Sequence, residues 1–185
     1  MEALPTRLDG PILVQPAVHR DQRGFFLESF RRDAFAELGI DEDFVQDNHS
    51  RSGRGIVRGM HFQIGAGQAK LVRVARGEVL DVLVDIRKGS PTFGEWEAFT
   101  LNDENLRLLY APVGFAHGFC VTSDVADVVY KCSNYYDSEI ERGIAFNDPD
   151  VGIEWPDVEL IASDRDANAP FLKDVESELP FVFQG

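Results

Sequence analysis

Runs of alternating apolar and polar residues follow one another through most of the chain and predict β-strands. The segment 78–86, EVLDVLVDI, shows the pattern well, because all of its even positions from 80 onward are apolar. Its odd positions carry two aspartates between apolar residues: Val79, Asp81, Leu83 and Asp85. Side chains of a strand alternate between its two faces, so both aspartates are expected on one face of a strand that is otherwise apolar.

Further strands are predicted at intervals of roughly 8–12 residues, with Gly, Pro, Asn and Asp between them. They fall within residues 9–30, 44–50, 55–63, 70–87, 95–101, 106–112, 114–123 and 127–136. A turn is expected around Asp21–Gly24, and Arg76-Gly77 is expected to form the turn of a hairpin. Many short strands with such turns indicate an antiparallel sandwich or barrel.

One helix is predicted over residues 31–39, RRDAFAELG. Phe30, Ala34, Phe35 and Leu38 share one face at helical spacing, and Gly39 supplies a stop signal. The segment after Trp155 is rich in Pro and Asp and is expected to form loops and short helical turns. With no internal repeat or linker, we expect a single domain spanning 1–185, which is long enough for a substantial core.

The composition limits the classes of partner that the protein can bind. A formal net charge of −14 argues against nucleic acid or an anionic membrane as partner, since both are bound mainly through Lys and Arg. A small anionic substrate needs only a few local cations and stays possible. No secretion signal and no run of ~18 apolar residues is seen. Cys120 and Cys132 lie in apolar runs and are expected to be buried thiols, as in a cytoplasmic protein.

Two histidines raise the question of chemistry. His61 lies in RGMHFQ and His117 in APVGFAHGF, both within predicted strands. His61 and Gln63 alternate onto one face, at a spacing that suits two metal ligands. Glutamine is a poor ligand, however, and a transition-metal site normally takes three or four His, Cys or carboxylate groups. The pattern therefore disfavours a metal and leaves catalytic groups or buried core histidines.

The residues around these histidines are polar and partly basic. Arg58 and Lys70 lie near His61 in sequence, and the predicted strand 127–136 carries a mixed polar face made of Tyr130, Cys132, Asn134 and Tyr136. Aromatic core packing would explain the two tyrosines equally well. Taken one at a time, these patterns indicate no more than an all-β domain for which an enzyme is one option.

Six segments together are more specific. In this order they resemble the dTDP-4-dehydrorhamnose 3,5-epimerase family, cupin-fold enzymes of deoxysugar-nucleotide biosynthesis. The segments are DQRGFFLESF (21–30), FVQDNHSRSGRGIVRGMHFQ (44–63), KLVRVARGEVLDVLVDIRKGSPTFGEW (70–96), APVGFAHGF (111–119), YKCSNYY (130–136) and FNDPDVGIEWP (146–156). The resemblance implies an all-β cupin-type jelly-roll barrel with a few short peripheral helices, a homodimer, and neither metal nor cofactor. The implied substrate is a dTDP-4-keto-6-deoxyhexose.

The resemblance also assigns roles to individual residues. It makes His61 the base, Asp166 its carboxylate partner, Tyr130 the opposing acid and Lys70 the cation beside the ketone. Tyr136 takes the place of the aromatic residue that stacks on the nucleotide base. The implied substrate contacts are Arg23, Glu28, Gln46, Asn48, Arg58, His117 and Glu141. Arg165 stands where the family commonly has lysine, and the loop IGAGQA (64–69) is one residue shorter than expected and has no proline.

Elementary chemistry agrees with these roles. Inverting a carbon beside a ketone requires a proton to leave one face and another to arrive on the opposite face. A neutral imidazole with a pKa of ~6.5 is a suitable base, a phenol can return the proton, and a fixed cation stabilises the enolate. Arg23 and Arg58 would hold the diphosphate. Three rivals stay open: a single-carbon epimerase on a related sugar, a metal-dependent cupin, and a non-catalytic sugar-nucleotide-binding cupin.

The assignments also carry a structural expectation. Residues 58 and 61 would point to opposite faces of an unbroken strand, yet the resemblance places both Arg58 and His61 in the pocket. A bulge or similar irregularity near Gly59 is therefore predicted, because glycine tolerates one.

Overall fold

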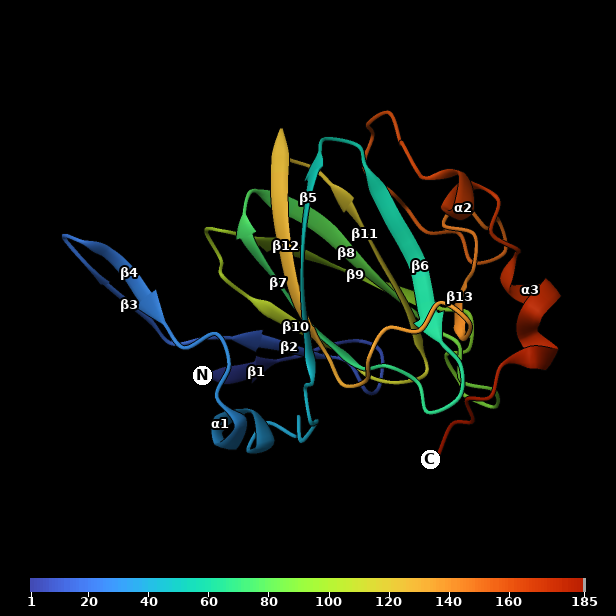
Figure 1. Cartoon of the computed structure of the whole chain (residues 1–185), viewed down its shortest axis with the longest axis horizontal. Helices are drawn as coiled ribbons and strands as arrows, with labels where there is room; N and C mark the ends of the chain where they lie inside the picture. The colour runs from blue at the N-terminus through green and yellow to red at the C-terminus, as the bar shows by residue number, and fades with distance from the viewer. Residues whose placement is uncertain (185) are drawn as a thin grey trace.

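The computed structural model describes residues 1–184 and contains two antiparallel β-sheets that face each other (Figure 1). The six-stranded sheet runs, from edge to edge, β1 (Glu2–Leu4), β2 (Ile12–Gln15), β10 (Leu108–Ala111), β7 (Lys70–Arg76), β12 (Val125–Cys132) and β5 (Gln46–Gly53). The five-stranded sheet runs β13 (Glu141–Gly143), β6 (Val57–Gln63), β11 (Phe115–Val121), β8 (Glu78–Asp85) and β9 (Trp96–Asn102). The predicted all-β jelly-roll fold is confirmed.

The helices are short and peripheral, as predicted. They are α1 (Arg32–Ala36), α2 (Asp164–Ala167), α3 (Leu172–Val175) and the 3-10 helix η1 (Glu176–Glu178). The first lies inside the predicted segment and buries Phe35 completely. The others lie in the C-terminal segment, at the opposite side of the barrel from α1 (Figure 1). Within residues 1–184, no helix has the length and apolar character needed to cross a membrane.

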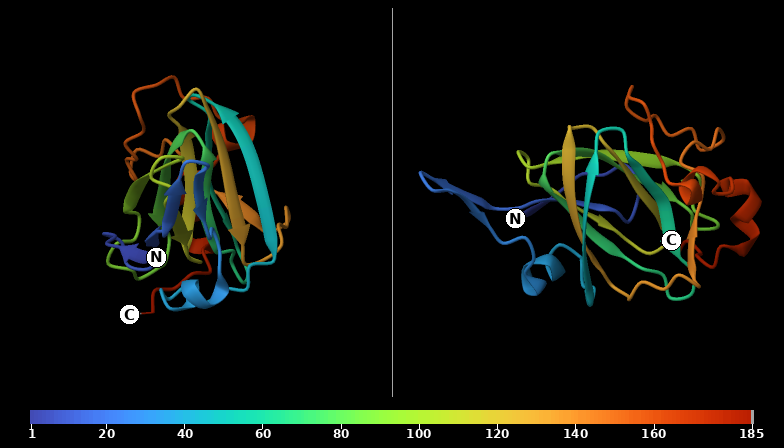
Figure 2. Two further views of the ribbon diagram at one scale, coloured as in Figure 1. Left: turned by 90° about the vertical axis from the view of Figure 1, so that its left-hand side faces the viewer. Right: turned by 45° about the horizontal axis from the view of Figure 1, so that its top comes forward.

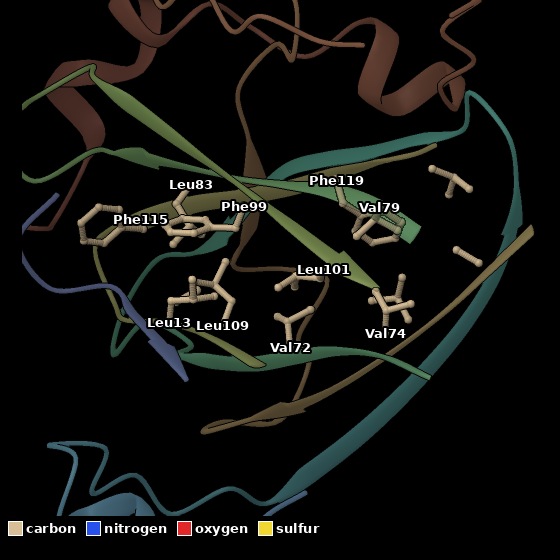
Figure 3. Close-up of a cluster of buried hydrophobic side chains, with 14 of the residues drawn as sticks. Leu13, Val72, Val74, Val79, Leu83, Phe99, Leu101, Leu109, Phe115 and Phe119 are labelled. Carbon is tan, nitrogen blue, oxygen red and sulfur yellow. The ribbon is translucent and has the colours of Figure 1, made fainter. Parts of the chain in front are cut away.

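The main core fills the space between the sheets. Side chains from both sheets meet there, among them Val72 from one sheet and Leu83 and Phe99 from the other (Figure 3). The alternation predicted for residues 78–86 is confirmed, because Val79 and Leu83 face this core while Val82 and Val84 face a second apolar cluster. That second cluster includes apolar residues of the C-terminal segment, which therefore covers the outer face of the five-stranded sheet: Phe146, Leu172, Leu179 and Phe181.

The prediction of a hairpin turn at Arg76-Gly77 is wrong. β7 pairs with β10 and β12, whereas β8 pairs with β9 and β11, so the chain crosses from one sheet to the other at Gly77. Gly77 has φ +75°, and a Cβ there would lie 2.1 Å from the carbonyl oxygen of Val125. A break between two alternating runs marks a turn but does not tell which strands pair across it.

The strand predicted over 127–136 ends earlier. β12 ends at Cys132, so the prediction that Asn134 and Tyr136 share a strand face with Tyr130 is wrong. Residues 133–140, here called the Tyr136 loop, connect β12 to β13. The Asn134 side chain contributes to this irregular path, because its Nδ2 donates to the carbonyl oxygen of Gly67 at 2.6 Å.

The predicted irregularity near Gly59 is confirmed. His61 pairs with His117 and Arg58 with Phe119, so two residues of β6 lie opposite the single Gly118 of β11. Gly59 has φ +137°, and a Cβ on it would lie 2.5 Å from the Cα of Gly118. Because of this bulge, Arg58 and His61 can line the same side of the strand.

A hairpin formed by β3 (Val18–Asp21) and β4 (Gly24–Leu27) projects away from the barrel (Figures 1 and 2). It forms a separate two-stranded sheet, and its turn lies where the sequence predicted one. Phe25 and Phe26 on β4 are 54% and 67% exposed. An isolated two-stranded hairpin is at best marginally stable in water.

The bulge provides a test of the fold. Gly59→Ala should lower the free energy of unfolding by at least about 2 kcal/mol, because the new methyl group meets Gly118 and the positive φ is strained. Gly53→Ala is the control, since Gly53 has no positive φ and its Cβ would meet nothing closer than 3.8 Å. Urea denaturation of both variants measures the difference. Equal stabilities would contradict the tight packing at Gly59.

Candidate active site

A cavity of about 560 Å³ is lined by side chains from both sheets and from the segment that leads into α2. It brings together most of the site residues predicted from the sequence: Arg58, His61, Lys70, His117, Tyr130, Tyr136, Glu141, Arg165 and Asp166. These residues come from β6, β7, β11, β12, β13 and α2, and from the Tyr136 loop. The cavity is therefore built by the barrel as a whole and not by one motif.

His61 and Asp166 form the central pair. Nε2 of His61 lies 2.7 Å from Oδ1 of Asp166, and the aspartate is almost fully buried. Burial by itself would raise the pKa of Asp166, but the hydrogen bond and charge of His61 and the Gly59 N–H outweigh it and hold that pKa below its usual value. An ionised carboxylate only accepts, so Nε2 carries the proton and Nδ1 keeps the lone pair that a base needs.

Asp166 is positioned by backbone contacts on both sides. Ser163 caps α2 by accepting a hydrogen bond from the Asp166 N–H at 3.2 Å. The N–H of Gly59 donates to the other carboxylate oxygen at 3.2 Å. Ile161 is tied to the start of β6, since Val57 N donates to its carbonyl at 2.8 Å. The carboxylate is thus fixed against the strand that carries its histidine.

Tyr130 lies on β12, in the sheet opposite His61. Burial, and next the neighbouring Cys132, raise the pKa of the Tyr130 phenol above its usual value, although a hydrogen bond with Asn48 acts in the other direction. The phenol therefore keeps its proton at neutral pH and can act as a donor.

Lys70 begins β7, opposite Cys132 of β12, and lines the same cavity as Tyr130. Burial lowers its pKa, while the nearby Cys132, Glu141 and Asp81 partly offset this effect. It has no ion-pair partner within 4.0 Å among residues 1–184. A desolvated lysine of this kind is available to a substrate oxygen.

A second histidine–aspartate pair lies on the five-stranded sheet. Nε2 of His117 is 2.9 and 3.0 Å from the two carboxylate oxygens of Asp81, which is completely buried. Asp81 is not among the site residues predicted from the sequence. The available signal was its place in the apolar run of β8, since an aspartate is rarely fully buried without a partner.

Arg58, Tyr136, Glu141 and Arg165 complete the polar lining. Arg165 forms an ion pair with Glu141, and the pKa of Tyr136 is raised mainly by its hydrogen bond with the same glutamate. Arg58 donates from Nε to Ser52 Oγ at 3.0 Å, which leaves the outer edge of its guanidinium for a ligand. This edge of the cavity can bind an anion.

Four predicted substrate contacts lie elsewhere in this chain. Gln46 and Asn48 bond to each other at 3.1 Å, and Asn48 reaches Tyr130. Arg23 and Glu28 lie on or beside the projecting hairpin and pair instead with Asp21 and with Arg31. The cavity formed by one chain does not include any of the four.

Two further polar groups bear on the cavity. Ser50 lines it, and within residues 1–184 its Oγ is the buried side-chain polar atom without a hydrogen-bond partner. Gln63 is 3% exposed, and both ends of its amide are hydrogen-bonded to protein backbone. In the described part of the chain, no three His, Cys, Asp or Glu side chains are grouped as a metal site.

Comparison with known proteins agrees with this geometry. The family model of dTDP-4-dehydrorhamnose 3,5-epimerase matches residues 5–174. The chain belongs to this family. It is thus a member of a family of isomerases with a jelly-roll fold, as the sequence predicted.

Individual relatives cover nearly the whole chain. The dTDP-4-dehydrorhamnose 3,5-epimerase of Methanothermobacter thermautotrophicus is 50% identical over 168 residues, which is 89% of this chain and 91% of that protein. A dTDP-6-deoxy-D-glucose-3,5-epimerase from Legionella pneumophila, solved with dTDP-4-keto-L-rhamnose, superposes with a TM-score of 0.96 at 46% identity, covering 100% of this chain and 99% of its own. ChmJ, a 3'-monoepimerase from Streptomyces bikiniensis, superposes with a TM-score of 0.88 at 40% identity, covering 94% of this chain and 89% of its own.

The buried ammonium of Lys70 predicts a conflict between stability and activity. Lys70→Met should unfold at the same or a higher temperature near pH 7, because it removes a charge that burial disfavours, while turnover falls by about 10²–10³-fold. The lowered pKa means that the unfolded chain binds the extra proton. The stability gain should therefore be largest well below pH 10 and fade as pH approaches the ordinary lysine pKa of ~10.4.

Lys131→Met is the matched control for this prediction. Lys131 also lies in the six-stranded sheet, but its ammonium reaches Asp47 on the surface at 3.0 Å. Thermal unfolding and turnover should both stay close to the parent values. A Lys70 variant that is less stable than the parent at every pH would contradict the argument.

Proposed function

We propose that the protein inverts C3 and C5, the carbons beside the C4 ketone of dTDP-4-keto-6-deoxyglucose, and so forms dTDP-4-keto-rhamnose. The observation that carries this proposal is the position of His61 and Tyr130 on opposite sheets, both facing one cavity. An inversion needs a base on one face of the carbon and an acid on the other. The family membership and the solved Legionella complex support the substrate class.

The order of the proton transfers follows from which group can accept a proton and which can donate one. Nδ1 of His61 takes the proton from the carbon beside the ketone, and Asp166 stabilises the imidazolium that forms. Electron density moves to the ketone oxygen, where the Lys70 ammonium stabilises the enolate. Tyr130 then gives its phenolic proton to the opposite face of the carbon. Burial of Tyr130 keeps that proton in place until the enolate forms.

The rest of the cavity suits a nucleotide diphosphate. Arg58 and Arg165 present guanidinium groups, which bind phosphate oxygens in forked hydrogen bonds. The half-exposed ring of Tyr136 offers a flat surface on which thymine can stack. We propose a cytoplasmic location, which suits the two free and buried thiols of Cys120 and Cys132.

A single-carbon epimerase on a related nucleotide deoxysugar is the second candidate. The likeness to the 3'-monoepimerase ChmJ favours keeping it, since that protein shares the fold at a TM-score of 0.88. The same base, acid and cation would serve either reaction. What differs is whether the sugar presents both carbons to the base, so counting the exchanged positions decides between the two.

Deuterium exchange tests the proton roles. In D₂O with dTDP-4-keto-6-deoxyglucose, the parent protein should incorporate deuterium at both C3 and C5, and His61→Asn at neither. Tyr130→Phe keeps the base and Lys70, so exchange with retention should continue while inversion falls by about 10²–10⁴-fold. NMR of the recovered sugar counts the labelled carbons. Exchange by His61→Asn at the parent rate would move the base to another residue, with His117 next to be tested.

We further propose that the protein is a homodimer in which the hairpin of one copy reaches the cavity of the other. The hairpin projects from its own barrel (Figure 2). It exposes Phe25 and Phe26. It also carries Arg23, whose guanidinium lies outside its own cavity. A second copy would cover the two rings and bring this cation to the diphosphate. Glu28, which follows β4, would arrive with it.

Mixed dimers test this arrangement. Arg23→Ala and His61→Asn should each lower activity severely when present in both chains. After co-unfolding and refolding the two variants together, mixed dimers should regain activity, because one cavity then has an intact His61 and receives an intact Arg23. The control is a mixture of Arg58→Ala and His61→Asn, which change the same cavity and should not recover by exchange of hairpins. A monomeric parent by light scattering, or no recovery in the first mixture, would contradict the proposal.

A further inference from the structure

Gln63 is the residue on β6 whose position the catalytic roles leave unexplained. It follows His61 by two positions, is buried to 3% exposure and lies opposite Glu141 in the ladder with β13. Its Nε2 donates to the carbonyl oxygen of Tyr135 at 3.2 Å, and its Oε1 accepts from the N–H of Asp137 at 2.9 Å. Both ends of the amide therefore hold the backbone on either side of Tyr136.

A second glutamine holds the residue between them. Oε1 of Gln46, on β5, accepts from the N–H of Tyr136 at 2.9 Å. Three successive residues of the Tyr136 loop are thus held by side chains from the two opposing sheets. Glu141 lies near the Tyr136 hydroxyl and raises its pKa. This explains why Gln46 contacts the loop instead of lining the cavity.

We propose that Gln63 is a positioning residue for nucleotide binding, which acts by fixing Tyr136 in the orientation that stacks on the base. The inference rests on the proposed function, in which the thymine of the substrate stacks on Tyr136 of this loop. The physical reason is preorganisation: a loop that is already ordered does not lose that freedom when the ligand binds. Without Gln63, one N–H and one carbonyl of the loop would lose their partners and the loop would loosen.

This role differs from a purely structural one in what it changes. A residue that only stabilises the fold would alter the unfolding temperature and leave the affinity for nucleotide alone. A residue that orders Tyr136 in the free protein alters the affinity, and its effect disappears once the Tyr136 ring is gone. At saturating substrate the chemical step should stay unchanged, because His61, Lys70 and Tyr130 are untouched.

The experiment compares Gln63→Met with Gln15→Met. Gln15 is a matched control, since its amide also bonds at both ends, to the carbonyl of Asn105 at 3.1 Å and to Arg107 at 3.1 Å, but away from the cavity. Calorimetric titration with dTDP should show binding weakened roughly 5-fold or more in Gln63→Met, with a raised KM and little change in kcat. Gln15→Met should bind as the parent does. Equal binding by both variants would overturn the proposal.

A double-mutant cycle separates this inference from its alternatives. Tyr136→Ala should weaken dTDP binding by about 5- to 150-fold, as expected for a lost base–aromatic stack. Adding Gln63→Met to Tyr136→Ala should change the affinity by less than about 2-fold, within the error of additive effects. Additive losses would overturn the positioning role. If Gln63→Met does not fold, Gln46→Met, which removes the contact to the Tyr136 N–H together with that to Asn48, should show the same coupling. A folded parent that binds no dTDP would instead reject the proposed function.

Discussion

The bulge at Gly59 is the constraint on which the candidate site depends. It turns Arg58 and His61 toward one cavity, and it frees the Gly59 N–H from the ladder so that this group can bind Asp166. One residue without a side chain therefore helps to place Arg58, His61 and Asp166 in the site. Gly118 on the facing strand is required for the same reason, because a Cβ there would lie 2.6 Å from the sulfur of Met60. The site thus rests on a backbone contact that larger residues would prevent.

Three of the cationic or protonatable groups that line the cavity are each paired with a carboxylate. Asp166 backs His61, Asp81 backs His117, and Glu141 backs Arg165. In the part of the chain that the structure describes, Lys70 has no ion-pair partner of this kind, and burial lowers its pKa although Cys132, Glu141 and Asp81 partly offset the effect. An acidic chain can hold an anionic substrate in this way, because fixed groups are already oriented toward the charge that develops. Burying such charged groups lowers the stability of the protein without its substrate.

The sequence predicts the strands well because alternation with period two is a local property. It places both aspartates of β8 on one face of the strand for the same reason, and both are buried. It fails where the answer depends on partners far along the chain: the strands flanking Gly77 belong to different sheets, and Tyr136 belongs to a loop. Nine of the residues to which the resemblance assigns roles line one cavity, but the resemblance does not reveal that Arg23 lies on the projecting hairpin. Only the tertiary arrangement places that arginine outside the cavity of its own chain.

Gln63 shows how the same strand can serve a different chemistry. In a barrel that binds a metal, a residue two positions after His61 on the same face would be a natural second ligand. Here that position carries an amide whose donor and acceptor both bind the backbone around Tyr136. In the proposed reaction the enolate is stabilised by the ammonium of Lys70 and needs no second ligand on β6. The position is then free to order the loop that holds the nucleotide. One strand thus carries both the catalytic base, His61, and the residue that orders the nucleotide-binding loop, Gln63.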